Sequence, residues 1–215
     1  MGRPRKDERQ GKPTRERILE TAIELFAQGS YHSVSVRQIT GALGLTEASF
    51  YNHFSGKDAL FTAIFERLER DLIAPGFAPV DPAAFGPAED FDLGEFLVAG
   101  ARRFFDSADR TTLLTWRILM SNQYHFPAAR RAVQEHILDA PVAFFTDLFE
   151  KLAGAGLLAD GLDPSAAGRT LAARFFEFSC RSNLNAAWGE ADPADRERLE
   201  TDLRFLAAYL QRGAV

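Results

Sequence analysis

Apolar residues recur at helical spacing through most of the chain. Ile18, Ala22, Leu25 and Phe26 fall on one helical face, and Gly29 follows them as a stop signal. This pattern predicts a helix over residues 14–28. No segment shows the alternation of a half-buried strand, and no internal repeat occurs. We therefore expect an all-α fold with about nine helices.

Two short helices joined by a tight turn are predicted next. Ser35 and Gln38 have the spacing of a capping box, which favours a helix over residues 36–43. Gly44 can adopt the left-handed conformation that a tight turn requires, and Thr46 is a good N-cap for a helix over residues 47–53. This arrangement is typical of a helix-turn-helix.

A fourth helix is predicted over residues 57–72, with an end before Pro75, because an apolar stripe runs from Leu60 to Leu68. Residues 74–90 contain four Pro and two Gly, which is typical of a connection or loop. We therefore predict a boundary near residue 72. The expected organisation is an arm at 1–13, a helix-turn-helix domain at 14–56, a connecting helix at 57–72 and a second domain at 73–215.

The second domain is predicted to consist of amphipathic helices. Asp92 and Glu95 have capping-box spacing at the start of an apolar helical face. Asp-Pro pairs at 163–164 and 192–193 place proline where a helix begins, and Pro141 should kink or break a long helix. Further helices are expected at 109–124, 128–153, 165–188 and 193–211.

The composition narrows the function classes. The single cysteine, Cys180, and the four histidines provide neither a disulfide framework nor a set of ligands with zinc spacing. No apolar run is long enough to span a bilayer. We therefore expect a cytoplasmic protein without a metal or another cofactor.

The charge is distributed unevenly. The net charge is −5, yet residues 1–60 hold nine basic and seven acidic residues, and residues 61–215 hold sixteen basic and twenty-three acidic residues. Within residues 1–17 there are seven basic and three acidic residues. A polyanion responds to local charge, so the acidic total does not exclude DNA as a partner.

The order of helices and the segment from Tyr51 to Leu60 resemble the TetR family of bacterial transcriptional regulators. The matching residues lie in the second predicted helix, at the end of the third and at the start of the fourth. They are Val36, Arg37, Ile39, Tyr51, His53, Phe54, Lys57 and Leu60. The resemblance covers about residues 14–65. It implies a DNA-binding domain followed by a ligand-binding and dimerisation domain.

The third helix is expected to enter the major groove of double-stranded DNA and to present its early turns to base edges. Phe50 and Phe54 should face the core of the small domain instead. The candidate base contacts are Thr46, Glu47, Ala48, Ser49 and Asn52. The candidate phosphate contacts are Ser35, Arg37, Tyr51, His53 and Lys57.

Three simpler interpretations stay open at this end of the chain. Residues 36–54 could form an ordinary helical hairpin in a bundle, and Glu47 could serve only to complement the N-terminus of its helix. The Gly2-Arg3-Pro4-Arg5 segment has the form of a minor-groove arm, in which Arg3 and Arg5 would enter the groove. A basic tail that only aids solubility would look the same.

Sixteen of the nineteen phenylalanines lie after residue 60, and such a stripe is ordinarily core. The resemblance implies that part of it lines a pocket for a small effector. The candidate pocket residues are Phe65, Phe96, Arg103, Phe104, Trp116, Met120, Asn122, Tyr124, His125, Phe145 and Phe149. Among them, His125 could equally be a capping or surface residue.

The resemblance also implies a homodimer in which the last two helices of each copy form a four-helix bundle. The expected apolar seam consists of Leu171, Phe175, Phe178, Leu199, Leu203, Leu206 and Leu210. An amphipathic helix could also bury such a seam within its own chain. A symmetric dimer would bind a near-palindromic operator.

The resulting prediction is a transcriptional regulator, a repressor that a small apolar or aromatic effector releases from DNA. The alternative is a DNA-binding adaptor or architectural protein without a ligand. An enzyme is not expected. Gly154-Ala-Gly156 follows a predicted helix and not a strand, so it should be a helix stop and not a dinucleotide loop. Cys180 lies in an apolar helix and lacks a neighbouring histidine in sequence.

Overall fold

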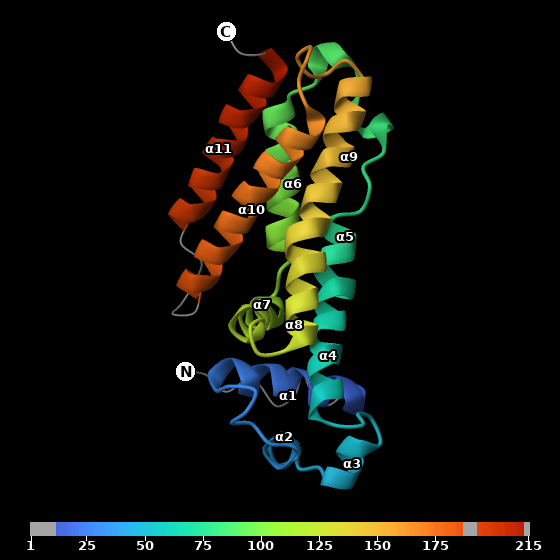
Figure 1. Cartoon of the computed structure of the whole chain (residues 1–215), viewed down its shortest axis with the longest axis vertical. Helices are drawn as coiled ribbons and strands as arrows, with labels where there is room; N and C mark the ends of the chain where they lie inside the picture. Colours follow the sequence, from blue (N-terminus) through green and yellow to red (C-terminus); the bar gives the residue numbers. More distant parts are fainter. Residues whose placement is uncertain (1–11, 187–192, 213–215) are drawn as a thin grey trace. The chain divides into compact units, whose positions relative to one another are not determined.

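A computed structural model describes residues 12–186 and 193–212, which form helices joined by short connections (Figure 1). No strand occurs in this part of the chain, and the all-α class is confirmed. The chain divides into two compact units. Unit 1 comprises Met1–Leu68 and Arg110–Arg130, and unit 2 comprises Glu69–Asp109 and Arg131–Val215.

Unit 1 contains the helices predicted at the front of the chain together with a later segment. Its elements are α1 (Thr14–Gln28), α2 (Val36–Leu43), α3 (Glu47–Tyr51), α4 (Lys57–Leu68), α7 (Arg110–Asn122) and the start of α8 (Pro127–Ala132). The first two helices have the predicted bounds. The third is shorter than expected because Asn52 and His53 form a turn.

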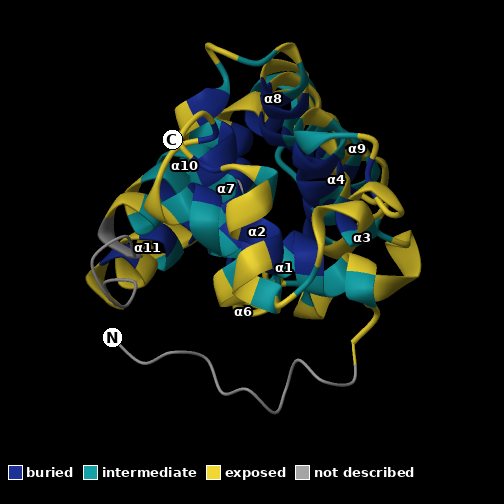
Figure 2. Cartoon of the chain, turned by 90° about the horizontal axis from the view of Figure 1, so that it is seen from below, coloured by how far each residue is buried: buried dark blue, intermediate teal, exposed yellow. Residues whose placement is uncertain are grey.

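The core of unit 1 explains why α7 belongs to it, although the sequence assigned residues after 72 to a second domain. Helix α1 packs against α2, α4 and α7, and α4 also packs against α7. The apolar stripe of α4, including Leu60, Phe61 and Ile64, is buried there, and Ile118 and Leu119 of α7 are equally buried. Figure 2 shows buried residues turned inward on α1 and α4 and exposed residues on the outer surface of α2.

Unit 2 is a helical bundle. Its elements are η1 (Glu69–Ile73), α5 (Ala74–Gly76), η2 (Pro82–Phe85), η3 (Ala88–Asp90), α6 (Leu93–Asp106), η4 (Val133–Asp139), α9 (Ala140–Gly154), α10 (Pro164–Ala186) and α11 (Pro193–Arg212). Helix α10 packs against α9, and α11 packs against α6 and α10 (Figure 1). In the part of the chain that is described, no helix is long and apolar enough to cross a membrane.

Two π-helical segments precede prolines in unit 2. The segment η1 follows α4 directly and leads into α5, so the helical path continues through Pro75 and does not end before it as predicted. A helix start tolerates proline because the first N–H groups have no intrahelical partner. Likewise, η4 lies within the long helix just before Pro141 at the start of α9. The helical path therefore continues through Pro141, with a change from π- to α-helical hydrogen bonding and without the expected break.

The glycine-rich stretch after α9 is a helix stop. Helix α9 ends at Gly154, and Gly156 has a φ of 71°. The N–H groups of Gly156 and Leu157 donate to the carbonyls of Ala153 and Leu152, which caps the last turn. This local geometry confirms the interpretation of these glycines as a C-terminal cap.

Candidate DNA-binding surface and ligand cavity

The turn between α2 and α3 has the local geometry of a helix-turn-helix. Ser35 caps α2, and its hydroxyl accepts from the Gln38 N–H at 3.2 Å while the Gln38 side chain accepts from the Ser35 N–H at 2.7 Å. Gly44 has a φ of 67° and a ψ of 29°, a left-handed conformation that favours glycine. The Thr46 hydroxyl caps α3 by accepting from the Ser49 N–H at 3.2 Å.

Two buried phenylalanines fix which face of α3 is exposed. Phe50 is 0% exposed and Phe54 is 4% exposed, which confirms that both face the core. The Arg15 guanidinium lies 4.9 Å from the centre of the Phe54 ring. The opposite face carries the predicted base-contacting residues. Thr46, Glu47, Ala48 and Asn52 are exposed, and Ser49 is half-buried.

Four of the five predicted phosphate contacts also lie at the surface. Ser35, Arg37, Tyr51 and His53 are exposed. Among the residues that the structure describes, Arg37 has no ion-pair partner. Its guanidinium is therefore available to a phosphate group, which Arg binds through two parallel hydrogen bonds.

Lys57, the fifth predicted phosphate contact, is occupied inside the domain. Its Nζ atom donates to the Tyr31 carbonyl at 2.7 Å and to the Val34 carbonyl at 2.9 Å, and it lies 4.2 Å from the centre of the Tyr31 ring. Because two of its three N–H bonds point inward, we assign Lys57 to positioning the loop between α1 and α2. The sequence could not show this, because Tyr31 and Val34 lie more than twenty residues away in the chain.

The same loop is held from a second side. The Tyr31 hydroxyl donates to the Asp58 carboxylate. Burial, followed by this hydrogen bond and by the charge of Asp58, raises the pKa of Tyr31 well above its usual value. Phe126 packs edge-on against Tyr31, with ring centres 4.4 Å apart. Residues from α4 and from the segment after α7 therefore fix the entry to α2.

Comparisons with known proteins agree with this geometry. Residues 18–64 match the family described as bacterial regulatory proteins, tetR family. The chain belongs to this family. The tetR family comprises regulatory proteins, and on that ground the prediction that the chain is not an enzyme is confirmed.

The similarity of this tetR-family chain to the curated protein UidR covers only part of each chain. It is 32% identical over 76 residues to the transcriptional regulator UidR of Escherichia coli K12, a match that covers 35% of this chain and 39% of UidR. The chain thus matches about two fifths of the length of this relative. The minor-groove arm with Arg3 and Arg5 lies outside the described residues.

Solved structures extend the similarity of fold to both units. SmeT in complex with triclosan has a TM-score of 0.69 and 21% identity, over 94% of this chain and 94% of SmeT. GusR of Salmonella enterica has a TM-score of 0.65 and 23% identity, over 93% of this chain and 97% of GusR. SmeT is the repressor of a multidrug efflux pump of Stenotrophomonas maltophilia. These likenesses establish the tetR-family fold of this chain.

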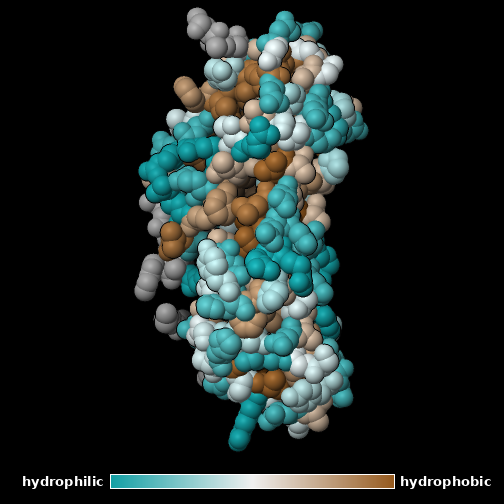
Figure 3. Space-filling model, viewed as in Figure 1, coloured by the Kyte–Doolittle hydropathy of each residue, from teal (hydrophilic) through white to brown (hydrophobic). Residues whose placement is uncertain are grey.

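Unit 2 of the tetR-family chain contains a cavity of about 660 Å³ that is partly open to the surface. Helix α6 contributes one wall, and η1, α5, α9 and α10 contribute the others. Figure 3 shows apolar side chains around a hollow in the face where α6, α9 and α10 come together. Gly76 shapes this wall, because a Cβ atom there would lie 2.4 Å from the Phe104 ring. Six phenylalanines line the cavity, namely Phe77, Phe96, Phe104, Phe144, Phe145 and Phe175.

The structure brings together only some of the predicted pocket residues. Phe96, Arg103, Phe104 and Phe145 line the cavity. Phe149 is 0% exposed in the core of unit 2 and does not reach it. The remaining candidates belong to unit 1, because α4 and α7 pack with α1, and they are not among the residues that line this cavity. They are Phe65, Trp116, Met120, Asn122, Tyr124 and His125.

Several lining residues were missed from the sequence. Phe77 lies in the proline-rich stretch that was predicted as a loop, and Phe144 neighbours Phe145 at the start of α9. Phe175 was assigned to the dimer seam. A double aromatic such as Phe144-Phe145 is a usable signal, because adjacent helical residues point about 100° apart and one helix can then contact two neighbours. Residue spacing alone does not show which of those neighbours leaves a space.

The predicted dimer seam is buried within its own chain. Six of the seven seam residues belong to the core of unit 2, namely Leu171, Phe175, Phe178, Leu199, Leu203 and Leu210, and Leu206 packs against this core. These residues therefore hold α10 and α11 in the bundle and are not a free interface. The exposed apolar residues on the two helices are different. Leu184 is 72% exposed, Phe205 is 78% exposed and Tyr209 is 52% exposed.

The two apolar faces of α11 were present in the sequence. Phe205 and Tyr209 are separated by four residues and therefore lie on one face, which differs from the face of the leucine stripe. A helix with two apolar faces needs two partners, and the bundle of unit 2 covers one of them. Because the leucine pattern is stronger, the second apolar face was not recognised from the sequence.

Proposed function

We propose that the chain is a DNA-binding transcriptional repressor with a small-molecule effector. The observation that carries this proposal is the exposed polar face of α3 beside exposed Arg37, held by a buried Phe50 and by the loop that Lys57 fixes. Such a face fits the major groove, with Asn52 and its neighbours at base edges and Arg37 at phosphates. Such a regulator works on chromosomal DNA, so we place it in the cytoplasm.

The cavity of unit 2 supports an effector over the alternative of a ligand-independent adaptor. Its volume of about 660 Å³ lies within the range of small-molecule sites, roughly 300–1,000 Å³. Protein interiors are normally close-packed, so a ligand-independent adaptor would be expected to fill this space with side chains. SmeT, whose fold is similar, was solved in complex with triclosan, and this complex supports a small-molecule site in the proposed regulator.

The proposed mechanism is linkage between the cavity and the DNA-binding surface. The chain passes between the two units after Leu68, Asp109 and Arg130. Asp71 and Ser107 line the cavity and lie within three residues of the first and second of these points. An effector that favours one conformation of these segments lowers the affinity for DNA by no more than its differential affinity for the two states.

The assignment of DNA contacts is tested by two substitutions. Genome-wide mapping of binding sites first identifies the operator, and mobility shifts then compare the variants on operator and random DNA. Arg37→Ala is expected to weaken binding to both and to lower the salt slope by about one, because one phosphate contact is lost. Asn52→Ala is expected to weaken operator binding by about tenfold or more and to spare random DNA.

The matched control for these substitutions is Arg169→Ala. It removes the same charge from an exposed position on α10, where the side chain donates a hydrogen bond to Ser165 and has no ion-pair partner in the described part of the chain. We expect its affinity for both DNAs to equal that of the wild type. An unchanged salt slope in Arg37→Ala, or an equal loss on both DNAs in Asn52→Ala, would contradict the assigned roles.

We further propose that a second copy covers the exposed face of α10 and α11 to form a homodimer that binds a near-palindromic operator. Wild type is expected to be a dimer at micromolar concentration by light scattering. Phe205→Asp should be a folded monomer with reduced operator affinity, because an unpaired carboxylate would be buried at the interface. Phe205→Leu keeps an apolar side chain and should remain dimeric. A monomeric wild type, or a dimeric Phe205→Asp, would refute this interface.

A further inference from the structure

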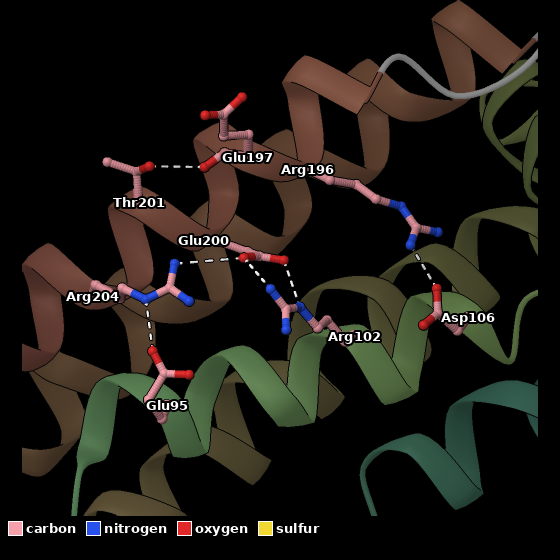
Figure 4. Close-up of polar contacts among 8 residues, drawn as sticks. All are labelled: Glu95, Arg102, Asp106, Arg196, Glu197, Glu200, Thr201 and Arg204. Carbon is pink, nitrogen blue, oxygen red and sulfur yellow. Dashed lines mark hydrogen bonds and ion pairs between the residues drawn. The ribbon is translucent and has the colours of Figure 1, made fainter.

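The charged residues of α6 differ in their partners. Glu95 contacts Arg204 at 2.8 Å, Arg102 contacts Glu200 at 2.6 Å, and Asp106 contacts Arg196 at 2.6 Å. All three of these ion pairs join α6 to α11, as Figure 4 shows. Of the charged residues on α6, three are therefore used to hold the bundle together.

Arg103 is the remaining charged residue of α6, and it lines the cavity. Within residues 12–186 and 193–212 it has no ion pair and no side-chain hydrogen bond. It follows Arg102 directly, so its side chain leaves the helix about 100° away from the face that contacts α11. Arg103, an exposed residue, thus lines a cavity whose other walls are mainly apolar and include six phenylalanines.

The other charged residue at the cavity is already neutralised. Asp71 accepts from the Arg70 guanidinium, with its Oδ1 atom 2.7 Å from Nε and its Oδ2 atom 3.1 Å from Nη2. Its carboxylate is therefore engaged by a neighbouring cation. Among the described lining residues, Ser107 alone carries a hydroxyl, and this hydroxyl donates to the Phe104 carbonyl at 2.7 Å. Arg103 remains as the strongest polar group that is open to an occupant.

We infer that the effector is an organic monoanion with an aromatic or apolar body and one carboxylate, which pairs with Arg103. This inference rests on the proposed function of the cavity as an effector site. The phenylalanine walls bind the body through buried apolar area and edge-to-face contacts. The Arg103 guanidinium binds the carboxylate through two parallel charge-assisted hydrogen bonds.

The same arrangement rejects related molecules. An organic cation would place its charge beside that of Arg103, and like charges repel each other. A neutral amide of the same shape keeps the apolar contacts but replaces the charge-assisted pair with weaker hydrogen bonds. The predicted order of affinity is therefore acid, then amide, then amine.

The test measures binding of three matched probes by isothermal titration calorimetry to the full-length chain. The probes are naphthalene-2-acetate, naphthalene-2-acetamide and 2-(2-naphthyl)ethylamine. Wild type should bind the acid about tenfold or more tightly than the amide. Arg103→Gln should remove this preference, whereas Arg102→Gln should retain it, because Arg102 carries the same charge but contacts Glu200 on α11. Circular dichroism establishes that both variants are folded.

Each result decides the inference. Equal affinities of wild type for acid and amide, a preference for the amine, or an acid preference that survives in Arg103→Gln would overturn the monoanion class. Failure of all three probes to bind would overturn it as well. The proposed function is tested separately by operator binding of the ligand-free protein, which none of these outcomes alters.

Discussion

Replacing Lys57 with methionine is expected to lower the free energy of unfolding by about 2–3 kcal/mol. The substitution keeps the apolar stem but removes the ammonium group that donates to the carbonyls of Tyr31 and Val34. Both carbonyls belong to buried residues, so they lose their partner without full access to water. Urea unfolding followed by circular dichroism measures the change.

Arg37→Met is the matched control, because Arg37 is an exposed basic residue of the same small domain. Its stability should stay within about 0.5 kcal/mol of the wild type, as is usual at the surface. In DNA binding the expected effects are reversed, so that Arg37→Met is affected and Lys57→Met is not. The salt slope falls in Arg37→Met and stays unchanged in Lys57→Met. If Lys57→Met were fully stable but had a reduced salt slope, Lys57 would be a phosphate contact after all.

Gly168→Ala is expected to destabilise the protein by about 1–3 kcal/mol, although alanine favours helices over glycine. Gly168 lies in α10 where that helix meets α9. A Cβ atom there would lie 2.6 Å from the Thr146 Oγ1 atom, 2.7 Å from its backbone N and 2.9 Å from its Cα. Backbone atoms cannot move aside as a side chain can, so the two helices must separate.

Gly100→Ala, in contrast, is expected to stabilise the protein. Gly100 lies inside α6, and no atom lies within 4 Å of the Cβ position. Without a clash, helix propensity should raise the stability by about 0.5–1 kcal/mol. Thermal unfolding of both variants shows whether stability falls in Gly168→Ala and rises in Gly100→Ala. A stabilised Gly168→Ala would show that α9 and α10 do not approach as closely as described.

The helix-turn-helix was predictable because its signals are local. The Ser35-Gln38 capping box, the left-handed Gly44 and the Thr46 cap each act within a few residues, and the helices α1 and α2 begin and end where the sequence predicted. The split between exposed polar residues and core residues around α3 also followed from spacing, since Phe50 and Phe54 lie one turn apart.

The cavity and the interface depended on packing between distant segments. Phe65 and Trp116 have the same aromatic character as Phe104, yet they lie in unit 1 because α4 and α7 pack with α1. Leu203 and Phe205 lie two residues apart on α11, and only the first is buried. Residue type and period cannot separate such positions, because each depends on which neighbouring helix is present.

The sequence by itself determined the all-α class and the helix-turn-helix, since caps, turns and helical periods are properties of short segments, and its matching residues carried the resemblance to the family. Only the tertiary structure decided that Lys57 fixes a loop, that Arg103 lines the cavity without an ion-pair partner among the described residues, and that Phe205 and Tyr209 remain exposed. The physical reason is that hydrogen-bond partners, unfilled space and exposure depend on the side chains that distant helices bring together.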